Sequence, residues 1–185
     1  MKLKKICLFH RYFYPDVAPC GQILTALFNS LAKEGHQVHV YTSTPSYRNN
    51  LKINNFKKEK NLIHPNLIIH RINLPPDNLN LFIRALNYLR LIFYFINQTS
   101  NKSFDLFVSA SIPQVIGSFS VSLLAYLKST PHIYYAMDIH PESAIFSENY
   151  KLFFIKKFLI LLDSITCKLA SQIIVQSHDM NKTLR

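Results

Sequence analysis

The densest polar cluster of the sequence lies at residues 137–143. Asp138 and Glu142 flank His140 there, directly after the apolar segment 132–136. Two carboxylates and an imidazole at the end of a buried strand cost free energy unless a ligand or a hydrogen-bond network satisfies them. The cluster is therefore a candidate ligand site. The alternative is a helix N-terminus with Glu142 in its first turn.

A second candidate site is the loop at 10–21, which joins an apolar segment to a helical pattern. Gly21 at that junction lets backbone N–H groups and the positive end of a helix approach an anion or a polar ligand. It is the only glycine of the loop, so the G-x-G-x-x-G pattern of dinucleotide-binding proteins is absent. A nicotinamide or flavin cofactor is not expected, and an ordinary strand-to-helix turn is the alternative.

No metal site or disulfide framework is expected. The eight histidines never fall at i and i+4 in one helix with a carboxylate between them. His36 is expected to be exposed or to cap a helix, and His39 to pack beside the sheet. Cys7, Cys20 and Cys167 are odd in number and far apart, which fits a reducing cytoplasm.

Short apolar runs rich in β-branched residues alternate with longer helical patterns, as in βαβ units. A polar segment at 43–61 offers no apolar face and is expected to be a mobile loop. Six strands are expected, at 4–9, 38–41, 67–74, 105–109, 132–136 and 172–176. Helices are expected at 21–34, 81–97, 114–127 and 151–170, with another beginning at 179.

This order predicts one Rossmann-like α/β domain over residues 1–185. Its doubly wound, mainly parallel sheet of about six strands has helices on both faces and the order 3-2-1-4-5-6. Ligands bind such sheets beyond the carboxyl ends of the strands, where the winding reverses. The loops after strands one, four and five, at 10–21, 109–113 and 137–143, are therefore expected to meet there.

The formal net charge of +11, from 21 Lys and Arg against 10 Asp and Glu, indicates an acidic partner or an ordinary solvated surface. The partner would be nucleic acid, an anionic membrane or a phosphorylated substrate. Neither an RNA-binding aromatic box nor zinc-finger spacing is present, so nucleic acid is not expected. With 49% hydrophobic and 17% charged residues, the chain is expected to fold.

Two segments are unusually apolar, at 79–96 and 152–162. Arg84 and Arg90 interrupt the first, and Lys156 and Lys157 interrupt the second, so neither is expected to span a membrane. Cations among aromatic residues suit the headgroup region of an anionic leaflet, and these four residues are candidate membrane-facing positions. No secretion signal is visible, so the expected location is the inner face of the cytoplasmic membrane. Burial by the sheet and neighbouring helices is the alternative.

Four segments, in order and at suitable spacing, resemble the N-terminal domain of family-4 retaining glycosyltransferases of the two-domain GT-B kind. The resemblance is greatest to the branch that builds bacterial capsule, colanic acid and O-antigen polysaccharides, and it covers nearly the whole chain. The Asp-x-x-Pro-Glu-Ser box is its most specific part. The segments are YFYPD at 12–16, EGHQVHVYT at 34–42, DIHPES at 138–143 and IIVQS at 173–177.

The resemblance implies transfer of a sugar from a nucleotide-sugar, with retention, to a lipid-linked or polysaccharide acceptor. It implies that Asp138 orients the acceptor hydroxyl or the transferred sugar, and that Glu142 is a second catalytic carboxylate. Further acceptor-binding residues would be His10, Asp16, Gly21, Ser111 and Ser177.

In this family a second domain holds the nucleotide-sugar, and none of its motifs occurs in this sequence. The isolated chain is therefore expected to be inactive, and no cofactor is expected. The alternative is a non-catalytic or split-gene subunit that presents acceptor and membrane surface to a separate donor-binding chain.

Overall fold

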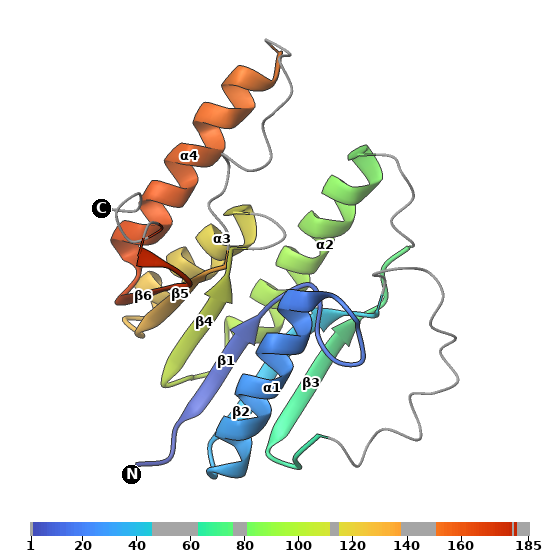
Figure 1. The fold of residues 1–185 in the computed structure, drawn as a ribbon, viewed down its shortest axis with the longest axis vertical. Helices are drawn as coiled ribbons and strands as arrows, with labels where there is room; N and C mark the ends of the chain where they lie inside the picture. The colour runs from blue at the N-terminus through green and yellow to red at the C-terminus, as the bar shows by residue number, and fades with distance from the viewer. Residues whose placement is uncertain are drawn as a thin grey trace. The chain divides into compact units, whose positions relative to one another are not determined.

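The computed structural model describes residues 2–45, 63–75, 81–111, 115–137, 151–178 and 180. Within them lie six strands and four helices (Figure 1). The strands are β1 (Lys5–Phe9), β2 (Gln37–Ser43), β3 (Leu67–Ile72), β4 (Leu106–Ala110), β5 (His132–Ala136) and β6 (Gln172–Val175). The helices are α1 (Pro19–Lys33), α2 (Leu81–Thr99), α3 (Val115–Leu127) and α4 (Lys151–Leu169).

The strand order is β3-β2-β1-β4-β5-β6, which confirms the predicted doubly wound Rossmann-like order. The chain forms two compact units, Met1–Asp105 and Leu106–Arg185. In the first, β1 and β3 each pair in parallel with β2; in the second, β4 and β6 each pair in parallel with β5. The predicted strands and helices agree with these elements to within a few residues.

In the first unit, helices cover both faces of the strands. The ring of Phe95 in α2 lies 4.8 Å from that of Phe9 in β1 and 5.7 Å from that of Tyr41 in β2. Successive side chains of a strand point to opposite faces, so Leu8 and Val40 face away from α2, and both are buried. The helix α1 contacts β2 and β3.

The ends of α1 follow from proline and glycine. Pro19 stands in the first turn, where its missing N–H costs nothing, so the helix begins two residues before the predicted start. Gly35 follows the helix with φ +97°. The N–H groups of Gly35 and His36 bond to the carbonyls of Ala32 and Leu31, the pattern of a Schellman C-terminus.

Two predictions near α1 and β2 need correction. His36 was expected to be exposed or to cap a helix. Its backbone N–H does cap α1, but its side chain is buried, and its Nδ1 accepts the Lys4 backbone N–H at 3.1 Å. The polar segment expected to begin as a loop at 43 begins later, because Ser43 is the last residue of β2 and is buried. Residues 46–61 of that segment lie outside the described residues, and so does the helix expected from 179, apart from Met180.

In the second unit, α3 and α4 contact each other, and both contact one face of β5. His132 and Tyr134 are alternate residues of β5 and share that face. The ring of His132 bonds to Ser122 of α3, and the hydroxyl of Tyr134 bonds to Asp163 of α4. Polar side chains as well as apolar contacts therefore hold the two helices on this strand.

Candidate functional site

The loop after β1 is tied to the end of β2 through one carbonyl group. The backbone oxygen of Arg11 accepts the Thr42 hydroxyl at 2.7 Å and the Ser43 hydroxyl at 3.0 Å. The backbone N–H of Ser43 donates to the same oxygen at 3.3 Å. Because three donors converge on it, this carbonyl fixes where the loop leaves the sheet.

His10, the first residue of this loop, is buried. Its Nδ1 lies 2.6 Å from the carbonyl oxygen of Tyr12 and 3.2 Å from the Tyr12 nitrogen. The shorter contact requires a proton on Nδ1, which leaves Nε2 as the acceptor atom of the neutral ring. The acceptor-binding role of His10 remains a prediction.

Asp16 and Arg71 belong to one polar group, in which Asp16 is buried and Arg71 is half-buried. Arg71 donates from Nη1 to the Ser43 carbonyl at 3.0 Å and from Nη2 to the Tyr14 carbonyl. Burial lowers the pKa of Arg71 to about 10, and the nearby Asp16 carboxylate opposes that shift by favouring the charged guanidinium. Arg71 thus joins β3 to the end of β2 and to the loop that carries the buried Asp16.

Gly21 is required by the packing of α1 against the same loop. A Cβ atom at this position would lie 3.1 Å from the carbonyl oxygen of Tyr12 and 3.3 Å from its Cβ. The Thr25 hydroxyl donates to the Gly21 carbonyl at 2.7 Å and accepts the Tyr14 N–H at 3.1 Å. This contact explains the glycine as an element of the turn, and a ligand at its backbone remains a prediction.

In the second unit, Ser111 joins the ends of two neighbouring strands. It follows β4 directly, and its buried hydroxyl oxygen accepts the backbone N–H of Met137 at 3.0 Å. Its own N–H donates to the Tyr135 carbonyl at 3.0 Å. Met137 immediately precedes Asp138 in the sequence, so Ser111 fixes the backbone from which the predicted catalytic segment departs. Asp138 and Glu142 themselves lie outside the described residues.

Ser177 follows β6 closely and is exposed. Its hydroxyl oxygen accepts the Met180 backbone N–H at 3.2 Å, as an N-terminal helix cap does. The structure thus gives Ser177 a local structural role, and acceptor binding remains a prediction.

A buried polar group lies at the start of β5. The two ring nitrogens of His132 lie 2.9 Å from the Ser109 hydroxyl and 2.8 Å from the Ser122 hydroxyl. Burial lowers the pKa of His132 to about 4. Burial, with the neighbouring Asp163, also raises the pKa of the Tyr134 phenol well above its usual value. Both rings are therefore neutral at pH 7 and act as fixed hydrogen-bonding groups.

The predicted membrane-facing residues differ in exposure. Arg90 and Lys157 are exposed, whereas Arg84 is half-buried and its Nε is out of contact with solvent. The side chain of Lys156 lies outside the described residues. Large apolar side chains at helical spacing on α2 have exposed fractions from 36% to 75%: Phe82, Leu86, Leu89, Phe93 and Ile96.

Neither a membrane span nor a metal cluster is found in the part of the chain that the structure describes. No helix there is both long and apolar enough to cross a bilayer. Nor do three His, Cys, Asp or Glu side chains gather there closely enough to hold an ion.

No protein-family model and no curated protein sequence matches the chain. Solved structures do match its fold. Arabidopsis thaliana UGT89C1 in complex with quercetin matches with a TM-score of 0.57 at 14% identity, over 99% of this chain and 46% of that one. The same protein complexed with UDP-L-rhamnose matches over 100% and 45%, with a TM-score of 0.57 at 14% identity.

LpCGTa in complex with UDP matches with a TM-score of 0.57 at 14% identity, over 95% of this chain and 47% of that one. The chain therefore spans just under half the length of these structures. At this identity the likeness concerns the fold alone, which is that of one half of a GT-B glycosyltransferase.

Proposed function

We propose that the chain is the acceptor-binding half of a retaining glycosyltransferase of family 4, which moves a sugar from a nucleotide-sugar to a lipid-linked glycan. The fold match to one half of solved glycosyltransferases carries the proposal. The sequence likeness adds the acceptor side, the family and the branch that makes bacterial capsule and O-antigen. Solved relatives are complexed with UDP and UDP-L-rhamnose, which supports a nucleotide-sugar as donor.

In this proposal Asp138 accepts a hydrogen bond from the acceptor hydroxyl and orients it toward the anomeric carbon. Glu142 provides a second hydrogen-bonding carboxylate. Ser111 acts indirectly, since it holds Met137 and so the start of this segment. Negative charge that develops on the leaving diphosphate is stabilised by positive groups of the donor-binding half. Most of the rate enhancement then comes from positioning and electrostatics.

The first prediction is that the isolated 185-residue chain does not transfer sugar. Its solved relatives are about twice as long, and the donor diphosphate would be held by their other half. The measurement is transfer from radiolabelled UDP-sugars and other nucleotide-sugars to a polyprenyl-diphosphate-linked sugar, with folding checked by circular dichroism. Turnover by the folded chain alone would contradict the division of the site between two domains.

An added donor-binding domain separates this proposal from its alternative. If transfer appears when that domain is supplied and requires Asp138, the chain is the acceptor half of an enzyme. If transfer requires the chain but survives Asp138→Ala and Glu142→Ala, the chain is a non-catalytic subunit that presents the acceptor.

A lipid-linked acceptor places the chain at a membrane surface, and α2 offers the apolar and cationic groups for this. Leu89 and Phe93 are exposed on the same helix as Arg90. A cation near an anionic leaflet adds about 1 kcal/mol to binding, and salt screens this contribution. The proposed location is therefore the inner face of the cytoplasmic membrane.

The second prediction is that the chain sediments with anionic vesicles at low salt, and less so at high salt or with neutral vesicles. The double variant Arg90→Glu and Lys157→Glu should lower anionic binding at least tenfold, because both side chains are exposed. The control is Lys4→Glu and Lys33→Glu, which changes net charge equally at exposed positions. Equal binding to both vesicle types, or equal losses in the two double variants, contradicts docking through α2 and α4.

A further inference from the structure

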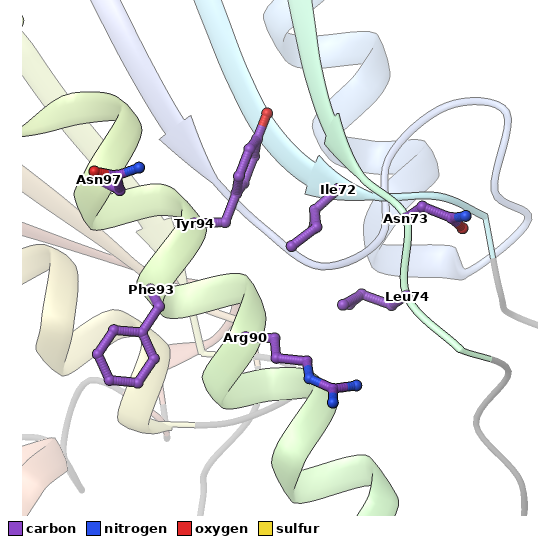
Figure 2. A pocket seen from close by; sticks show the side chains of 7 residues that line it. All are labelled: Ile72, Asn73, Leu74, Arg90, Phe93, Tyr94 and Asn97. Carbon is purple, nitrogen blue, oxygen red and sulfur yellow. The ribbon is translucent and has the colours of Figure 1, made fainter.

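A groove of about 690 Å³ lies between α2 and the chain at the end of β3. Ile72, Asn73 and Leu74 line one side, and Arg90, Phe93, Tyr94 and Asn97 line the other (Figure 2). Figure 2 shows the side chains of Arg90 and Leu74 extending into the space between helix and segment, while the ring of Phe93 points away from it. The volume is in the range of small-molecule sites.

The inner end of the groove rests on a rigid aromatic stack. The ring of Tyr94 meets that of Tyr41 edge-on at 6.5 Å between centroids. Tyr41, fully buried, stacks on His70 of β3 at 4.5 Å. Tyr94 is therefore held between a packed core and the groove, and its position is set before any ligand binds.

The lining combines one cation with apolar walls and two amides. Ile72, Leu74 and Tyr94 supply apolar surface, and Arg90 is the only charged residue among the seven lining residues. Guanidinium groups recognise phosphate through paired N–H donors. Asn73 and Asn97 are exposed amides that can donate further hydrogen bonds to phosphate oxygens. The chemistry fits a molecule with a phosphate at one end and a hydrocarbon chain at the other.

We infer that this groove binds the phosphate and the first carbons of a lipid phosphate, with Arg90 on the phosphate and with Leu74 and Tyr94 on the chain. The exposed apolar residues of α2 lie on the helix face beside the groove, the face of Phe93, and give the rest of the chain a surface to follow. The inference rests on the proposed function only in that the lipid phosphate would be the phosphate of the acceptor. The test of the inference measures binding and needs no sugar transfer.

The test uses tryptophan as a reporter, because the protein has none. Leu74→Trp places the reporter in the groove, and Leu127→Trp places it at an exposed position of α3. Asn97→Trp, also exposed and in the groove, is the second reporter if Leu74→Trp does not fold. The probes are dodecyl phosphate and dodecyl maltoside below their micelle-forming concentrations, and inorganic phosphate.

Dodecyl phosphate should shift the groove reporter to the blue saturably and leave the α3 reporter unchanged. Arg90→Gln should weaken that binding at least tenfold, because one charge-assisted pair is lost, whereas Lys33→Gln should not. Dodecyl maltoside should bind more weakly and be indifferent to Arg90. Inorganic phosphate should compete only at much higher concentration.

Three results overturn the inference. Equal shifts at both reporters show adsorption of detergent rather than a site. Binding of dodecyl maltoside as tight as that of dodecyl phosphate shows that the phosphate is not recognised. Inorganic phosphate binding as tight as dodecyl phosphate shows an anion site with no part for the apolar walls. None of these results decides whether the completed enzyme transfers sugar, so the two proposals fail separately.

Discussion

Replacing Asp138 by alanine in the complete two-domain enzyme is expected to lower the rate of sugar transfer about 100-fold or more. The carboxylate is proposed to orient the reacting hydroxyl, and removal of one well-placed polar group commonly costs about 2.7–4 kcal/mol of transition-state stabilisation. The measurement is steady-state transfer at saturating nucleotide-sugar with the acceptor varied. Asp138→Asn keeps the shape and removes the charge, so it separates hydrogen bonding from electrostatic stabilisation.

The control for this substitution is Glu34→Ala, which removes an exposed carboxylate at the end of α1 and should leave the rate unchanged. One outcome for Asp138→Ala would contradict its catalytic role. If turnover stays near the wild-type value while the free energy of unfolding falls by about 1 kcal/mol, Asp138 is a helix cap. Its assignment to catalysis would then be wrong.

The free energy of unfolding is expected to fall by about 3 kcal/mol between pH 7.5 and pH 4 through His132 alone. Burial lowers the pKa of this ring to about 4 in the folded chain, whereas an unfolded histidine titrates near 6.5. Below pH 6.5 the His132 ring is protonated in the unfolded chain, whereas in the folded chain it is protonated only near pH 4. The contribution is therefore complete above pH 6.5 and is lost as the pH falls from 6.5 to 4.

The measurement is urea unfolding across this pH range, with a variant that removes the imidazole and both of its partners. Ser109→Ala, Ser122→Ala and His132→Leu together leave no buried hydroxyl without its bond. Wild type should lose about 3 kcal/mol more than this variant. The control, His178→Asn, changes an exposed imidazole and should lose as much as wild type. Identical losses in the triple variant and wild type would show that His132 does not titrate as argued.

His39, in the first unit, also lowers the free energy of unfolding as the pH falls, and it is present in every variant. Burial is the main cause that lowers its pKa to about 4, and His70, Lys5 and Lys102 add to the shift. Its Nδ1 lies 3.0 Å from Nε2 of His70, so the two rings cannot both take up a proton at that contact. Comparison of variants therefore isolates His132, whereas the absolute slope of stability against pH does not.

The fold was predictable because its signals are local. Alternating apolar runs and helical patterns gave all six strands, and the handedness of βαβ crossovers then restricted the strand order. Gly35 likewise predicted the end of α1, because the glycine that ends a helix depends only on the conformation of the helix's last turn. The signal for the end of β2 was not local. The strand continues to Ser43, whose hydroxyl donates to the carbonyl of Arg11, 32 residues earlier.

The site was less predictable for the same reason. Arg71 carries no motif, and its role depends on the register that pairs it with Thr42 and on a loop that folds back to it. The burial of the His36 side chain was missed because its contact with Lys4 joins the end of one helix to the start of a distant strand. The link from Ser111 to Met137 likewise appears only when β4 and β5 lie side by side.

The guanidinium of Arg71 has a consequence for the evolution of such chains. It bonds to carbonyls of two segments, at Ser43 and Tyr14, and lies near Asp16. An insertion or deletion between Phe9 and Gly21 would move the Tyr14 carbonyl away and leave a half-buried cation with an incomplete set of acceptors. Changes in the length of this loop should therefore be rare among related chains and, where they occur, accompanied by a substitution at position 71. The loop and position 71 are distant in sequence but should change together in evolution.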